Sequence, residues 1–239
     1  MRSLNLFLAV VGSLFFGSSA QAYILIDDFT VGEYHTSITG TGNRDNLSIN
    51  LDKAHCFAGE RGTNYTVSNN PFGYTTFFDI AGHQAKVTTP GPEDLSTQLT
   101  VSYGQLHQMN LDISGEIGSL PGGRGKLFEI DLGMTPPNLF ARVWSVYMID
   151  GAGRVNSNET FGTRIGGIQF NREGFFGDAD FNWSDIDYFI FRQNWSNGDT
   201  SPLTYWTSEI RVVPEPSVMT AVIFGAFILS RSRCKRLRE

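Results

Sequence analysis

The sequence predicts an all-β protein whose central part folds as a jelly-roll-like β-sandwich. Short runs rich in Val, Ile, Thr, Tyr and Phe alternate with Gly, Asn, Asp and Pro at intervals of about ten residues, a pattern typical of strands joined by turns. Period-two alternation places Leu99, Val101 and Tyr103 on one face of a strand. The same spacing in Met109, Leu111 and Ile113 predicts another strand. The predicted strands are 23–29, 34–37, 64–68, 74–80, 98–103, 108–113, 126–132, 140–149, 165–171, 186–192 and 205–213.

Residues 1–22 have the pattern of a cleaved export signal. Arg2 precedes an apolar stretch, Leu4 to Phe16, which is too short to span a bilayer comfortably. Ala20-Gln21-Ala22 then gives the small-x-small pattern that signal peptidase accepts. We therefore expect a signal-peptide helix over 1–22, processing by signal peptidase, and a mature chain that starts at Tyr23.

The C-terminal residues 214–239 form a second segment of distinct composition. Pro214, Glu215 and Pro216 precede an uncharged run, and Arg-rich residues close the chain. Two prolines keep the approach extended and accessible. The run predicts a single transmembrane helix over 218–230, with the basic end held on the cytoplasmic side. Its twelve uncharged residues, 218–229, span only about 18 Å as a helix, against roughly 30 Å of hydrocarbon core, so the span is marginal.

This ordered set of elements resembles the PEP-CTERM sorting signal. The resemblance implies recognition by an exosortase-type processing enzyme, a membrane-held intermediate, and delivery to the cell surface or extracellular matrix. It also implies a setting in which extracellular polysaccharide is made. The chain accordingly divides into a signal peptide (1–22), an ectodomain (23–213) and a sorting signal (214–239).

The ectodomain is more acidic than the chain as a whole. Of the 18 Lys and Arg residues, one lies in the leader and five in the tail, whereas only two of the 24 Asp and Glu residues lie outside the ectodomain. Its net charge is therefore about −10, against −6 for the whole chain. Such a surface disfavours nucleic acid as a partner. Cys56 is the single cysteine of this part, and we expect it to be buried.

Short stretches of the ectodomain carry a second resemblance. The segments "ILIDDFT", "CFAGERGTNYTVS" and "DFNWSDIDYFIF" look like uncharacterised PEP-CTERM proteins whose ectodomains are similar to galactose-binding-like jelly rolls. The resemblance implies that the first and last strands come together, with "YWTSEIRVV" as the last. It also implies an association with sugars.

The sequence contains no complete catalytic constellation. The segment "EIDLGM" resembles the start of a laminarinase-type glucanase motif, with Glu129 and Asp131 on one face of a strand. Met134 stands where that family places its acid/base glutamate. The four histidines are isolated, so zinc chemistry is unsupported. We therefore predict a non-enzyme that requires no cofactor, with a secreted glycan-degrading hydrolase as the alternative.

Acidic side chains raise the question of calcium. Asp178 and Asp180 begin a series of oxygen-bearing residues at alternate positions, without the glycine and glutamate of an EF-hand. Two interpretations remain open: a structural calcium site shared with Asp27 and Asp28, and a solvated acidic turn.

Aromatic residues gather toward the end of the ectodomain, and one of them lies in a turn-like context. Trp195 in "QNWSNGD" is the candidate for an exposed platform that stacks on sugar rings, with Asn194, Asn197 and Asp199 as hydrogen-bonding neighbours. We therefore expect an exported, non-catalytic domain that binds polysaccharide. A matrix structural protein without a specific ligand is a further alternative.

Overall fold

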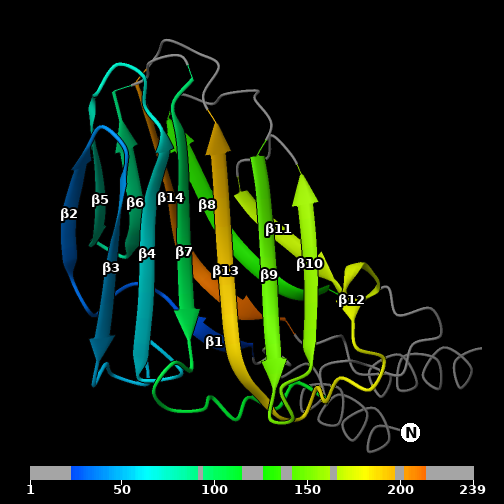
Figure 1. Ribbon diagram of the computed structural model, residues 1–239. Helices are drawn as coiled ribbons and strands as arrows, with labels where there is room; N and C mark the ends of the chain where they lie inside the picture. Colours follow the sequence, from blue (N-terminus) through cyan, green and yellow to red (C-terminus); the bar gives the residue numbers. More distant parts are fainter. Residues whose placement is uncertain are drawn as a thin grey trace, which may run out of the picture.

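Two antiparallel sheets packed face to face form the described part of the chain (Figure 1). The computed structural model describes residues 23–90, 94–114, 126–135, 142–161, 166–196 and 202–213. Sheet I has the order β11 (Gly166–Asn171), β8 (Lys126–Thr135), β14 (Leu203–Val212), β6 (Gln84–Thr89), β5 (Thr75–Ala81) and β2 (Tyr34–Thr39), with β1 (Ile24–Asp27) also paired to β14. Sheet II has the order β12 (Phe176–Gly177), β10 (Val155–Phe161), β9 (Arg142–Asp150), β13 (Ile186–Ser196), β7 (Ser96–Tyr103), β4 (Glu60–Asn69) and β3 (Gly42–Ile49). A short 3-10 helix, η1 (Arg172–Gly174), precedes β12. The predicted β-sandwich is thus confirmed.

The core lies between the sheets and is built by strand alternation. Leu99, Val101 and Tyr103 all face inward from β7, as their spacing predicts. In β13 the inward set includes Phe189 and Phe191, both fully buried. Burying each such side chain contributes roughly 1.5–3 kcal/mol, so two layers of aromatic and branched residues supply the main stabilisation. The outward positions of the same strands are left available for other roles.

With one exception, the strand predictions were correct where apolar residues alternate, whereas strands with few apolar residues were missed. The strands β3, β6 and β10 were missed because their sequences, "GNRDNLSI", "QAKVTT" and "VNSNETF", carry few apolar residues. The strand predicted over 108–113 is wrong. This stretch is irregular apart from one isolated bridge, Leu111 with Ile186, although Met109, Leu111 and Ile113 are buried as expected. The three side chains are spaced so that all of them pack into the core. The left-handed backbone at Asn110, with φ of 49°, prevents the regular hydrogen bonding of a strand.

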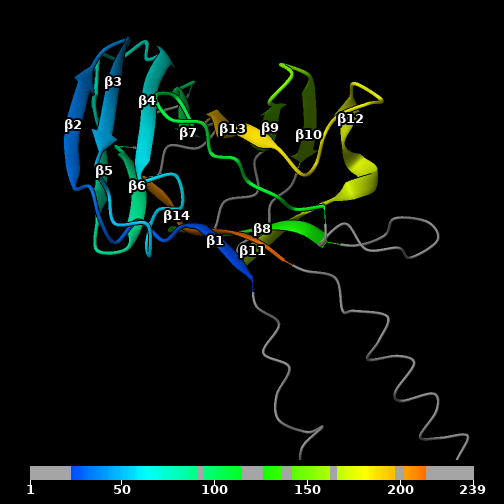
Figure 2. The same cartoon turned by 90° about the horizontal axis from the view of Figure 1, so that it is seen from below.

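The first and last strands lie side by side, as the resemblance implied (Figure 2). Ile24 of β1 pairs with Val212 of β14, and the Val213 amide donates to the Leu127 carbonyl at 3.0 Å. The ends of the described chain therefore leave the sandwich at one place. The predicted signal peptide (1–22) and sorting signal (214–239) lie outside the described residues. Within the described ranges, no helix is long and apolar enough to cross a membrane.

Candidate functional site

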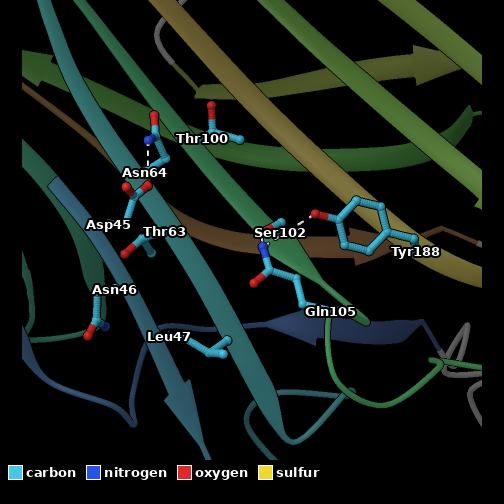
Figure 3. A pocket seen from close by; sticks show the side chains of 9 residues that line it. All are labelled: Asp45, Asn46, Leu47, Thr63, Asn64, Thr100, Ser102, Gln105 and Tyr188. Atoms are coloured by element: carbon cyan, nitrogen blue, oxygen red, sulfur yellow. Dashed lines mark hydrogen bonds between the residues drawn. The ribbon is translucent and has the colours of Figure 1, made fainter. Parts of the chain in front are cut away.

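A groove of about 390 Å³ opens on the outer face of sheet II (Figure 3). It crosses β3, β4 and β7 and reaches β13 and the loop after β7. Its lining is mainly polar: Asp45, Asn46, Leu47, Thr63, Asn64, Thr100, Ser102, Gln105 and Tyr188. Amide, hydroxyl and carboxylate groups are thus gathered beside one phenol ring.

Strand alternation points most of these side chains outward, whereas Thr63 and its partner Asn46 lie on the inward-facing positions of their strands. In β4, Tyr65 and Val67 enter the core, so the residue between Thr63 and Tyr65, Asn64, faces solvent. The Asn64 side-chain amide donates to the Asp45 carboxylate at 2.6 Å, across the β3–β4 pair. Because one oxygen of Asp45 accepts this bond, the carboxylate is oriented and keeps acceptor capacity for a second partner.

Gly62 makes room for the Gln105 side chain at the floor of the groove. A Cβ at this position would lie 2.6 Å from both the Gln105 Nε2 and the Ser102 Oγ. In its absence the Gln105 amide donates to Ser102 Oγ at 2.7 Å and lies 3.3 Å from the Tyr188 hydroxyl (Figure 3). The glycine therefore lets Gln105 lie over β4 and join β7 to β13.

The loop that carries Gln105 is anchored by Glu60. The Glu60 carboxylate accepts from the Leu106 amide at 2.7 Å and lies 3.0 Å from the His107 Nδ1. Burial raises the pKa of Glu60, but the hydrogen bonds from Leu106 and His107 outweigh it and leave the pKa lowered. Glu60 is therefore ionised at neutral pH and holds the loop against the start of β4.

The prediction that Trp195 is an exposed platform is wrong. Trp195 is 2% exposed, and its ring packs on Tyr205 with centroids 5.9 Å apart. The strand β13 runs on to Ser196, so the segment read as a turn continues the alternation that buries Phe189 and Phe191. Asn194 does face outward, where it accepts from Gln98 at 2.5 Å. Asn197 and Asp199 lie outside the described residues.

Asp27 and Asp28 have protein partners. The buried Asp27 carboxylate pairs with the Arg61 guanidinium through bonds of 2.5 and 2.8 Å and accepts from the Tyr103 hydroxyl at 2.8 Å. Asp28 lies 2.8 Å from the His55 Nδ1. These contacts tie the end of β1 to sheet II. Next to them, Cys56 is buried as predicted, and burial raises the pKa of its thiol to about 12.

Asp178 and Asp180 lie in the loop after β12, on a different segment from Asp27 and Asp28. The Asp178 carboxylate accepts from the Val155 amide at 2.8 Å, at the start of β10, and Asp180 is exposed. Among the described side chains, no group of three or more His, Cys, Asp or Glu is arranged to hold a metal ion. Calcium binding stays a prediction.

Glu129 and Asp131 share the outer face of sheet I, as their spacing predicts. Both are held by Arg211 on the neighbouring strand β14, at 3.2 and 3.1 Å, and Glu209 joins them at 2.6 Å. Burial lowers the pKa of Arg211, but the three carboxylates outweigh it and raise the pKa. The two carboxylates therefore belong to an ion-pair cluster centred on a guanidinium.

The groove residues gave only a weak signal in the sequence. Thr100 lies between the apolar residues Leu99 and Val101, which marks it as outward-facing but says nothing of a shared site, and Asn64, between Thr63 and Tyr65, is marked less clearly. Gln105 belongs to a loop, and its position depends on the glycine of another strand. Only the pairing of β3, β4, β7 and β13 brings these residues together.

Comparison with known proteins finds solved structures that match this chain at low TM-scores. No family model matches the chain. No curated protein matches it either. A family 11 carbohydrate-binding module from Clostridium thermocellum, in complex with a β-1,3-1,4-mixed-linked tetrasaccharide, is 12% identical with a TM-score of 0.34 and covers 83% of this chain and 99% of its own. An agarase (12% identity, TM-score 0.38) and an exo-β-agarase (9%, 0.37) match over 64% and 82% of this chain but only 23% and 25% of theirs. At scores this low the strands do not superpose closely, so no residue or property is carried over from these proteins.

Proposed function

We propose that the ectodomain is a non-catalytic polysaccharide-binding β-sandwich whose ligand lies on the outer face of sheet II. The observation that carries the proposal is the groove itself, in which Asp45, Asn64, Gln105 and Tyr188 gather hydrogen-bonding groups around open space. Sugar hydroxyls both donate and accept hydrogen bonds, so amides, hydroxyls and carboxylates on a fixed surface suit them. The Tyr188 ring adds a surface for sugar C–H groups.

The contacts among these side chains support a preformed site. Asn64 is oriented by Asp45, and Gln105 by Ser102 and Tyr188. Because these contacts hold the groups in place before a ligand arrives, little conformational entropy is lost on binding. The non-catalytic part of the proposal rests on Arg211, which pairs with both Glu129 and Asp131.

A binding assay with matched tyrosine variants tests the proposal. We expect the protein to bind at least one polysaccharide in a panel measured by affinity electrophoresis and calorimetry. Replacing Tyr188 with Ala should weaken that binding about tenfold, since it removes ring contact and a hydroxyl. Tyr74→Ala is the control, because Tyr74 is 43% exposed on the turn between β4 and β5, away from the groove. Failure of every glycan to bind, or equal losses in both variants, contradicts the proposal.

We also propose that the chain is exported and sorted to the cell surface or matrix through its PEP-CTERM-like tail by an exosortase-type enzyme. The positions at which the sandwich begins and ends along the chain support this proposal. The strand β1 starts at Ile24, two residues after the predicted signal-peptidase site, and β14 ends at Val212, two residues before Pro214. Processing at either end would thus leave the sandwich intact.

Intact mass of the protein from its native host tests the sorting proposal. We expect a species that begins at Tyr23 and ends between Pro214 and Ser217. A species that retains Lys235 and Arg238 would overturn it, because the tail would then be a plain anchor.

A further inference from the structure

A row of polar side chains continues the groove across sheet II. The register pairs Asp45 with Asn64, Asn64 with Thr100, Thr100 with Arg192, and Arg192 with Ser145. The row therefore crosses β3, β4, β7, β13 and β9 at right angles to the strands. Its first three members line the groove, whereas Arg192 and Ser145 lie beyond it. A chain-like ligand that follows the row would leave the groove over Arg192.

Arg192 and Ser145 each carry a buried polar atom that has no hydrogen-bond partner among the described residues. The Arg192 guanidinium lies over the Tyr147 ring, 5.1 Å from its centroid, and within the described part of the chain it makes no ion pair. Its buried Nε has no hydrogen-bond partner, and neither has the Oγ of Ser145, which is 1% exposed. A buried polar group left unpaired is destabilising, and alanine at position 145 would avoid it. Both atoms are buried, so a ligand on this face would meet the end of the Arg192 guanidinium rather than its Nε or the Ser145 hydroxyl.

The nearby carboxylates are engaged elsewhere. Asp45 accepts from Asn64 at 2.6 Å, and Glu159, opposite Ser145 on β10, accepts from the Tyr147 hydroxyl at 3.0 Å. These carboxylates lie toward the two ends of the row, with the unpaired cation of Arg192 between them. Arg192 is therefore the one cationic side chain of the row.

We propose that the groove extends over Arg192 and that Arg192 binds the carboxylate of an acidic polysaccharide, one built from or containing uronic acid units. The inference rests on the proposed polysaccharide-binding function and names its ligand class. A guanidinium presents a planar fork of donors that matches a carboxylate, and stacking on Tyr147 fixes the plane of that fork. The net charge of the domain, about −10, opposes long-range attraction of such a polymer. Recognition of the acidic polysaccharide therefore depends on short-range contact with Arg192 and not on long-range attraction.

Binding of alginate and polygalacturonate oligomers tests the inference. Each oligomer is compared with the same oligomer after chemical reduction of its carboxyl groups. With the whole protein, we expect one acidic oligomer to bind about tenfold more tightly than its reduced form, the size expected for one charged hydrogen-bonded contact. Arg192→Gln should abolish this preference, whereas Arg192→Lys should keep part of it. Lys86→Gln is the matched control, because it removes one positive charge from β6 on sheet I and should leave the preference unchanged. An unchanged thermal midpoint shows that each variant is folded.

The possible failures are distinguishable. Equal binding of the acidic and reduced oligomers, or a preference that survives Arg192→Gln, overturns the role of Arg192. If a neutral glycan still binds and depends on Tyr188, the proposed function stands without this inference. If no glycan of either kind binds, both are wrong.

Discussion

At the scale of single residues, the buried charged side chains pair with each other inside the fold, whereas an outward-facing one is available to a ligand. Arg61 and Asp27 are fully buried and satisfy each other, with Tyr103 as a third partner. Such a pair adds little to net stability, because removing two charges from water offsets much of their attraction. Arg192, by contrast, faces outward and lacks an ion pair among the described residues.

Removing one member of the buried pair should be costly. Arg61→Met leaves the Asp27 carboxylate buried without its counter-charge, so we expect a loss of about 3–5 kcal/mol in the free energy of unfolding, measured by urea denaturation. Tyr103→Phe keeps the pair and removes one hydrogen bond to a charged group, so a smaller loss of about 1.5–3 kcal/mol is expected. Equal losses in the two variants would contradict this account.

The His55–Asp28 contact should make a small, pH-dependent contribution. The hydrogen bond to Asp28 raises the pKa of His55 above its ordinary 6.5. The stabilisation is therefore complete below pH 6.5 and is lost as the pH rises through the folded-state pKa. A histidine ring titration followed by NMR should show the raised value, and Asp28→Asn should return it toward 6.5. A His55 pKa that does not respond to this substitution would show that the contact is absent in solution.

At the scale of elements, Trp206 on β14 lies directly over Gly133 on β8. A Cβ on Gly133 would approach the indole Cε2 and Cζ2 to 2.2 Å. The ring thus covers the gap that the glycine leaves in the outer face of sheet I, beside the Arg211 cluster. Aromatic rings over strand glycines compensate for the missing side chain.

A pair of substitutions tests that contact. Gly133→Ala should cost about 1–3 kcal/mol of unfolding free energy, because the added methyl group displaces the indole. In a Trp206→Ala background the same substitution should cost much less, a non-additivity that denaturation of both single variants and the double variant measures. Additive losses would show that the two side chains do not interact.

At the scale of the whole molecule, alternation of apolar residues is sufficient to predict the sandwich but not its functional face. Strands such as β7 and β13 were predictable because their inward residues are apolar and regularly spaced. Trp195 was assigned to the surface because "QNWSNGD" contains turn-forming residues, yet β13 extends through it and buries the ring. The groove depends on long-range register, such as Asn64 with Thr100, and no local pattern in the sequence encodes this.

The central claim is that a polysaccharide lies across the outer face of sheet II, and NMR titration of the side-chain amides tests it most directly. Asn64 and Gln105 each carry an NH₂ group in the groove, whereas Gln169, exposed on β11 of sheet I, is the internal control. On addition of a binding oligosaccharide, the Asn64 and Gln105 signals should shift in a saturable manner while Gln169 stays unchanged. Shifts confined to Gln169 and sheet I, with Asn64 and Gln105 unmoved at saturation, would contradict the account.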